Sequence, residues 1–135
     1  MKTSLLTLFT FLLVTSSTYL SASDIWIHNY DQALTIAKKQ NKNVYLFIGA
    51  DICKFCKKYK EQTLSKANVM KRLTKDYVPV YLSRDQHFIP KKYEKYGVPR
   101  HYFLDSTGKI FFDTRGLLEE EGFYTMLDEA ELSQE

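Results

Sequence analysis

The stretch from Val44 to Lys57, VYLFIGADICKFCK, determines how the rest of the chain is interpreted. Its first five residues are an unbroken run of apolar, mostly β-branched and aromatic side chains, which is typical of a strand buried on both faces of a sheet. A short loop follows, and a lysine-rich helix is predicted over residues 53–63. Cys53 and Cys56 therefore lie where a central strand passes into a helix.

This position of the cysteine pair favours redox chemistry. Backbone N–H groups and the dipole at the beginning of a helix stabilise a thiolate on Cys53, which makes this residue a nucleophile. Cys56, one helical turn further on, is placed to resolve a mixed disulfide. Lys54 and Lys57 add positive potential, reduced by solvent screening, and Phe55 separates the two cysteines. These three side chains are candidates for tuning the reaction.

Two other roles for the cysteines fit the sequence less well. In the chain-entropy model a structural disulfide that closes four residues stabilises a fold by about 2 kcal/mol, against about 4.7 kcal/mol for a loop of about 100 residues. A metal site would need two further ligands, and His28, His87 and His101 lack the spacing of a zinc finger. We therefore expect no metal and no bound cofactor, because the cysteines themselves would carry the electrons.

The composition indicates one folded domain. The chain has 135 residues, of which 44% are hydrophobic and 15% aromatic, which is enough for a single core. Lys and Arg number 19 against 16 Asp and Glu, so the formal net charge is only +3. No basic run is interleaved with aromatic residues, and we expect no nucleic-acid partner. Two cysteines also exclude a disulfide-rich scaffold and a four-cysteine zinc site.

Residues 1–22 have the pattern of a cleaved export signal. Lys2 supplies a positive start, a largely apolar run of ten extends from Leu5 to Val14, and small polar residues follow. A run of ten residues falls short of the roughly 20 that span a bilayer, and an uncleaved anchor is the alternative. We expect a monomeric domain over residues 23–135 that is periplasmic or secreted, without stable membrane insertion after cleavage. Disulfides persist in such compartments.

The remaining segments predict strands and helices in alternation, which is the pattern of an α/β fold. Strands are expected over residues 24–29, 77–82, 102–104 and 110–113, and helices over residues 32–40 with Asp31 as N-cap, after Ser65, between Pro90 and Gly97, and from residues 119–121 onward. Pro79 inside a strand indicates a sheet edge or a bulge. Helical crossovers imply parallel strands, and the last hairpin adds an antiparallel edge. The expected architecture is a central mixed sheet flanked by helices.

A second signal, Val98-Pro99, completes a resemblance to a known family. The chain resembles the thioredoxin-like superfamily, and within it the small exported thioredoxin-related proteins and the C-terminal periplasmic domain of the electron-transfer protein DsbD. The likeness covers about residues 24–130 and depends on the order of several short motifs. These are Trp26 before a helix with Ala33-Leu34, Ala37-Lys38 and Asn41-Lys42, then Cys53 to Lys57, Glu61 to Val69, Tyr96 to Pro99, and Leu104 to Gly108.

The resemblance implies a thiol-disulfide oxidoreductase. It implies that the Val98–Pro99 peptide bond is cis and lies against the cysteines, so that the Val98 backbone can pair with a substrate strand. The substrates would be protein thiols or disulfides, and a redox partner protein would donate or accept electrons. Likeness to the DsbD domain favours a disulfide reductase or electron relay. A disulfide oxidase or isomerase, and a non-catalytic thioredoxin-like binding module, are the alternatives.

Two positions depart from the pattern of the family. Ile52 stands where thioredoxins usually have Trp, and Phe47 stands where they bury an Asp that helps to move the proton of the second cysteine. A phenylalanine cannot carry a proton, so water or another group, for example near Lys57, would have to do so. His101, two residues after Pro99, is expected either to tune the site or to be an exposed strand histidine.

Overall fold

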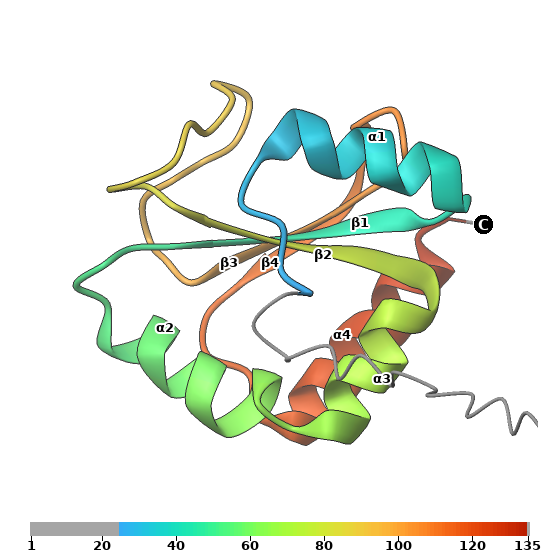
Figure 1. The fold of residues 1–135 in the computed structure, drawn as a ribbon. Helices are drawn as coiled ribbons and strands as arrows, with labels where there is room; N and C mark the ends of the chain where they lie inside the picture. Colours follow the sequence, from blue (N-terminus) through green and yellow to red (C-terminus); the bar gives the residue numbers. More distant parts are fainter. Residues whose placement is uncertain (1–24, 135) are drawn as a thin grey trace, which may run out of the picture.

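The computed structural model describes residues 25–134 and contains a four-stranded mixed sheet with helices on both faces (Figure 1). The predicted export signal, residues 1–22, lies outside the described residues. The elements are α1 (Tyr30–Gln40), β1 (Asn43–Gly49), α2 (Lys54–Tyr59), the π-helical segment η2 (Lys60–Leu64), α3 (Ala67–Asp76), β2 (Tyr77–Ser83), β3 (Arg100–Leu104), β4 (Ile110–Arg115) and α4 (Glu120–Leu132). Helix α1 covers one face of the sheet, and α2, α3 and α4 cover the other. The predicted α/β class is confirmed.

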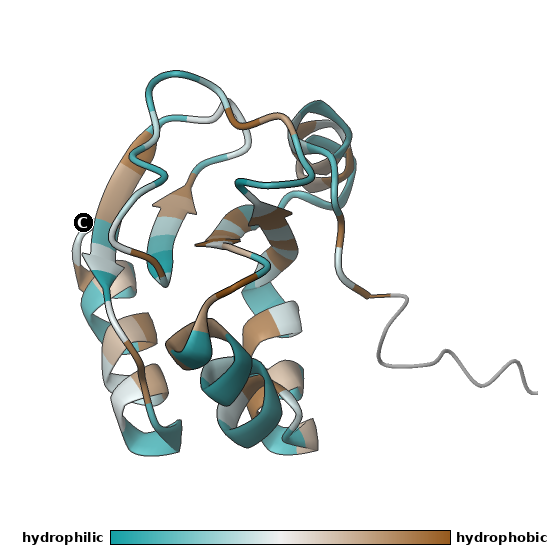
Figure 2. Ribbon diagram, turned by 90° about the vertical axis from the view of Figure 1, so that its left-hand side faces the viewer, coloured by the Kyte–Doolittle hydropathy of each residue, from teal (hydrophilic) through white to brown (hydrophobic). Residues whose placement is uncertain are grey.

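Strand β1 is buried on both faces, as its apolar run predicts. It lies between β2, to which it is parallel, and β3, to which it is antiparallel. Because side chains alternate along a strand, Tyr45 and Phe47 enter one core cluster, and Val44, Leu46 and Ile48 enter the other. In Figure 2 the central strands are largely brown, and hydrophilic teal residues are frequent in the loops above them.

The expected first strand over residues 24–29 is wrong in extent. Ile27 forms an isolated parallel bridge with Val80, and its N–H donates to the carbonyl of Pro79 at 3.0 Å. The sheet proper therefore ends at β2, which confirms the edge position indicated by Pro79.

Two helices begin at residues other than those predicted. Asn29, not Asp31, caps α1, because its side-chain oxygen accepts a hydrogen bond of 2.9 Å from the backbone N–H of Gln32. Lys66, not Ser65, precedes α3, because the Ser65 hydroxyl donates instead to the carbonyl four residues earlier. Both polar residues still mark helix boundaries to within two positions.

The predicted helix between Pro90 and Gly97 is wrong. Residues 84–99 form an irregular connection, in which Gly97 takes a left-handed conformation with φ of +66°. Contacts with distant segments replace helical bonds here, since the buried Tyr93 places its hydroxyl 2.9 Å from that of Tyr30. Without a crossover helix, β3 returns antiparallel to β1 and not parallel to it.

Helix α4 begins at the acidic run, as predicted. Glu120 and Glu121 lie in its first turn, where carboxylates stabilise the positive end of the helix dipole. Its inner side packs on the sheet through Phe123, Met126, Leu127 and Ala130. Within residues 25–134, no helix combines the length and the apolar character needed to cross a membrane.

Candidate redox site

Strand β1 leads directly to the cysteine pair. Cys53 and Cys56 form a disulfide, and their Cα atoms are 5.2 Å apart. Cys53 is the N-cap of α2, and its Sγ accepts a hydrogen bond of 3.1 Å from the backbone N–H of Cys56. A sulfur that accepts an N–H at the beginning of a helix is well placed to hold negative charge when the disulfide opens.

The two sulfur atoms have different surroundings. Cys53 is half-buried at the surface, whereas Cys56 is 1% exposed and belongs to the aromatic core cluster beneath α2. An incoming partner can therefore reach Cys53 but not Cys56.

The side chains that flank the pair are exposed. Ile52 is 96% exposed and Phe55 is 55% exposed, so they form an apolar rim next to the disulfide. Lys54 faces solvent as well. The Lys57 ammonium lies 3.8 Å from the Glu61 carboxylate in an exposed pair, where water and salt weaken the interaction. The structure therefore places Lys57 on the outer surface of the helix.

The Val98–Pro99 segment packs on the same core cluster as the cysteines. The peptide bond between these two residues is cis. Val98 is half-buried, and within residues 25–134 its N–H and C=O form no backbone hydrogen bond. The Pro99 carbonyl accepts a hydrogen bond of 2.8 Å from the N–H of Gly116, which holds the segment in place. The Val98 backbone is thus available to another chain.

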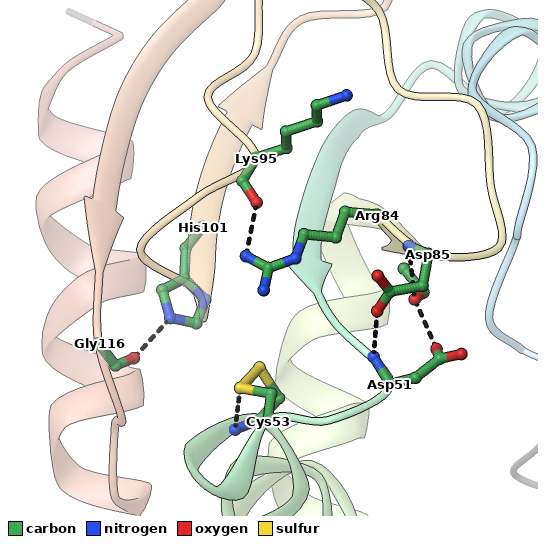
Figure 3. The surroundings of a disulfide bond; sticks show 9 residues. Asp51, Cys53, Arg84, Asp85, Lys95, His101 and Gly116 are labelled. Carbon is green, nitrogen blue, oxygen red and sulfur yellow. Dashed lines mark hydrogen bonds between the residues drawn. A yellow bond between two sulfur atoms is a disulfide. The ribbon is translucent and has the colours of Figure 1, made fainter.

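His101 is fully buried, so the expectation of an exposed strand histidine is wrong. Its Nε2 donates to the Gly116 carbonyl at 2.9 Å (Figure 3), so its Nδ1 accepts the hydrogen bond of 2.8 Å from the Tyr45 hydroxyl. The Tyr59 hydroxyl donates in turn to Tyr45 at 2.8 Å. Burial lowers the pKa of His101 to about 4, so the ring is neutral at pH 7. A polar residue is buried here because both of its nitrogens have partners.

A second polar network ties the loop before the cysteines to the loop after β2. The Asp51 carboxylate accepts hydrogen bonds from the Ser83 hydroxyl at 2.7 Å and the Gln86 amide at 2.8 Å. The backbone N–H of Asp51 donates to the Asp85 carboxylate at 2.7 Å (Figure 3). The hydrogen bonds from Gln86 and Ser83 lower the pKa of Asp51. Sequence reasoning missed this network, because its members are more than 30 positions apart and form no motif.

Aromatic side chains replace an acidic group beneath the cysteines. Phe47 is fully buried, and its ring centroid lies 4.9 Å from that of Tyr81 and 5.2 Å from that of Tyr59. The Lys60 ammonium lies over the Tyr81 ring, 3.6 Å from its centroid. The sequence indicated Lys60 only as one of several lysines on a helix face, and the structure places its ammonium over this aromatic group.

The histidines of the chain do not converge on one site. His28 and His87 stack on each other with centroids 5.3 Å apart, whereas His101 lies in the core. Among the residues that the structure describes, no three or more His, Cys, Asp or Glu side chains are arranged to hold a metal ion.

Comparison with known proteins places these features in a family. Residues 30–131 match the model of a family described as a thioredoxin-like domain. An uncharacterized protein from Archaeoglobus fulgidus is 33% identical over 55 residues, which cover 41% of this chain and 43% of that relative. The chain therefore matches less than half the length of this curated relative.

Two solved structures illustrate the likeness in fold. The oxidised C-terminal domain of DsbD from Neisseria meningitidis has a TM-score of 0.61 and 20% identity, covering 73% of this chain and 90% of that domain. A disulphide isomerase from Xylella fastidiosa has a TM-score of 0.60 and 19% identity, covering 77% of this chain and 87% of that protein. At such identities the likeness shows the fold.

Proposed function

Since this chain belongs to the thioredoxin-like domain family, we propose that it is an exported thiol-disulfide oxidoreductase acting through Cys53 and Cys56. The observation that carries the proposal is the asymmetric pair: an accessible sulfur at the start of α2, bonded to a buried one. Export is supported by the composition of residues 1–22, where a positive start precedes a short apolar run.

The proposed reaction passes two electrons and needs no bound cofactor. The Cys53 thiolate attacks one sulfur of a substrate disulfide, forming a mixed disulfide and releasing the first substrate thiolate. The Cys56 thiolate then attacks the Cys53 Sγ, which restores the internal disulfide and releases the second substrate thiolate. A dithiol of a redox partner protein reduces the internal disulfide again by the same two exchanges.

The substrate chain would be held beside Cys53 by backbone and apolar contacts. The N–H and C=O of Val98, which form no backbone hydrogen bond within residues 25–134, could bond an extended segment, as in strand addition. Ile52 and Phe55 supply exposed apolar surface on the other side of the sulfur. These features suit an unfolded or extended protein thiol better than a small molecule.

We infer that the direction of the reaction is reductive, as a disulfide reductase or an electron relay. The similarity to the DsbD domain supports this direction, whereas the similarity to a disulphide isomerase supports the second candidate, an oxidase or isomerase. The reduction potential decides between them. Motifs of this class range from about −270 mV to about −120 mV.

Insulin turnover with dithiothreitol tests the activity. Wild-type protein should accelerate insulin reduction, whereas Cys53→Ser should not and should form no adduct with a disulfide substrate. Cys56→Ser is the matched comparison, since it keeps the attacking sulfur and should accumulate the mixed disulfide. If all three proteins behave alike, the chain is a non-catalytic binding module and the proposal is wrong.

Equilibration in glutathione buffers tests the direction. The fraction of alkylated thiols at each buffer ratio gives the potential, and we expect a value more negative than about −150 mV. A less negative value would overturn the reductive direction and favour an oxidase or isomerase.

Cell fractionation of the full chain tests export. The mature protein should appear outside the cytosol with its N-terminus near residue 23. Retention in the cytosol with residues 1–22 intact would contradict this part of the proposal.

A further inference from the structure

The Cys56 sulfur needs a polar neighbour to hold the charge that develops on it, and Phe47 cannot supply one. Most polar groups of the core beneath the cysteines are already paired. His101 uses both of its ring nitrogens, and the hydroxyls of Tyr45 and Tyr59 bond each other. The polar group that serves this sulfur must come from elsewhere.

Tyr81 of β2 and the Cys56 sulfur both lie next to Gly49. In the sheet register Tyr81 stands opposite Phe47, against which its ring packs. A carbon at the Cβ position of Gly49 would lie 3.1 Å from the Tyr81 hydroxyl oxygen and 3.5 Å from Cys56 Sγ. The hydroxyl and the sulfur therefore border the same small space, which exists because residue 49 has no side chain.

The Tyr81 hydroxyl is free to serve as a donor. Within residues 25–134, Tyr81 forms its hydrogen bonds through the backbone: its carbonyl contacts His28 Nδ1 at 2.9 Å, and its N–H donates to Ile27 at 3.0 Å. The side chain is only half-buried, so water can reach its hydroxyl edge.

Lys60 places a positive charge over the ring that carries this hydroxyl. Its Nζ lies 3.6 Å from the centroid of the Tyr81 ring, which is a cation–π contact. A cation over the ring draws electron density from the phenol oxygen and makes its O–H a stronger donor. Lys57 is turned away from this role by its pairing with Glu61.

We propose that the Tyr81 hydroxyl donates a hydrogen bond to the Cys56 sulfur when the disulfide opens, with Gly49 and Lys60 as positioning residues. The inference rests on the proposed function. In the resolving step the Cys56 thiol loses its proton to water, and the thiolate accepts the O–H of Tyr81. The thiolate electron pair then attacks the Cys53 Sγ, the bond from Cys53 to the substrate sulfur breaks, and the substrate leaves as a thiolate.

The reaction of the reduced protein with Ellman's reagent separates the two steps. Cys53 attacks first and releases one coloured thiolate, in a phase that depends on reagent concentration. Cys56 then resolves the mixed disulfide and releases the second coloured thiolate, in a phase independent of that concentration. Stopped-flow traces from pH 5 to pH 10 give a separate pH profile for each sulfur.

Tyr81→Phe removes the hydroxyl and little else. We expect the midpoint of the second phase to rise by about one pH unit. Because a less stabilised thiolate is also more nucleophilic, the second phase should slow about threefold at pH 7 and accelerate about threefold above both midpoints. The first phase should not change. Tyr124→Phe, which removes a hydroxyl on α4, is the matched control and should leave both phases as in the wild type.

Two further variants test the positioning residues. Gly49→Ala keeps every hydroxyl but places a methyl group 2.9 Å from Cε2 of Tyr81, so the ring must move. It should reproduce the pH profile of Tyr81→Phe. Lys60→Met should raise the midpoint of the second phase by a smaller amount, whereas Lys71→Met on α3 should not raise it.

The second phase of Tyr81→Phe should be slower than that of the wild type at low pH and faster at high pH. This crossing of the two pH profiles distinguishes a hydrogen bond to the Cys56 sulfur from a purely structural role of Tyr81. An unchanged second phase in Tyr81→Phe would overturn the proposal. A parallel slowing of both phases at every pH would overturn it too, because it would indicate a general loss of structure. If the wild type itself shows no second phase, the proposed function fails, independently of Tyr81.

Discussion

The two faces of β1 carry different kinds of side chain. The face toward α1 is aliphatic, with Val44, Leu46 and Ile48 packed against alanines of the helix. The face toward α2, α3 and α4 is aromatic, and Tyr45 and Phe47 there adjoin the buried cysteine. One face of β1 therefore carries only aliphatic side chains, whereas the other carries aromatic side chains in a cluster that also contains the buried sulfur.

This difference shows that the core contains polar side chains only where they can form hydrogen bonds. Tyr45, Tyr59 and His101 are buried without loss because each polar atom has a partner at hydrogen-bond distance. Burial raises the pKa of both tyrosines, so they stay neutral. The aromatic face thus places polar but uncharged side chains beneath the disulfide.

The largest expected effect comes from the aliphatic face. Leu46→Ala should reduce the free energy of unfolding by about 2–5 kcal/mol, because Leu46 is fully buried in the central strand. The rate at which the folded protein reacts through Cys53 should not change. Urea denaturation and the Ellman reaction measure these two quantities.

Leu132→Ala is the matched control for this prediction, since Leu132 is 69% exposed at the end of α4. Its effect on the free energy of unfolding should stay below about 0.5 kcal/mol. A slower reaction of Cys53 in folded Leu46→Ala would contradict this distinction, because it would show that the aliphatic face of β1 also affects the reactivity of Cys53.

The next largest effect concerns pH and the aromatic face. The pKa of His101 is about 4 in the folded protein, below the ordinary value of 6.5. Between these values the unfolded chain binds the proton and the folded protein does not, so stability is complete above about pH 6.5 and falls as the pH drops toward 4. The full change is about 3 kcal/mol for this one group.

His101→Gln should remove this slope, although it also lowers stability at pH 7 through lost hydrogen bonds. Urea midpoints between pH 4 and pH 7 provide the measurement. Leu132→Ala, which removes an exposed side chain and leaves all three histidines in place, should keep the wild-type slope. An equally steep slope in His101→Gln would mean that protonation of His101 does not cause the loss of stability at low pH.

The sequence predicted those parts of the site that are contiguous. Cys53 and Cys56 follow a buried strand within one short segment, so their place at the start of a helix could be read directly. The parallel pairing of β1 with β2 followed from the same alternation of segments, because a helical crossover connects the two strands. Local patterns suffice where neighbours in sequence are also neighbours in space.

The sequence did not predict contacts that depend on register between strands. Tyr81 lies next to Gly49, which also borders the Cys56 sulfur, only because β1 and β2 pair in one particular alignment. His101 was expected either to tune the site or to be exposed, and its burial could not be foreseen because its partners Tyr45 and Gly116 are 56 and 15 positions away. Burial of a polar group depends on such partners, which no single segment reveals.

The smallest expected effect concerns the apolar rim next to the disulfide. It tests whether exposed Ile52 contacts a bound protein substrate. Ile52→Ser should change the free energy of unfolding by less than about 0.5 kcal/mol, because the side chain is 96% exposed. If Ile52 covers part of a bound protein chain, the KM for a protein disulfide should rise about fivefold, since partial burial of such a side chain contributes about 1 kcal/mol. Reaction with Ellman's reagent, which is too small to cover the rim, should not change. Leu132→Ser removes an exposed apolar side chain elsewhere and should alter neither value. An unchanged KM in Ile52→Ser would remove Ile52 from the substrate contact and leave Cys53, Phe55 and the Val98 backbone.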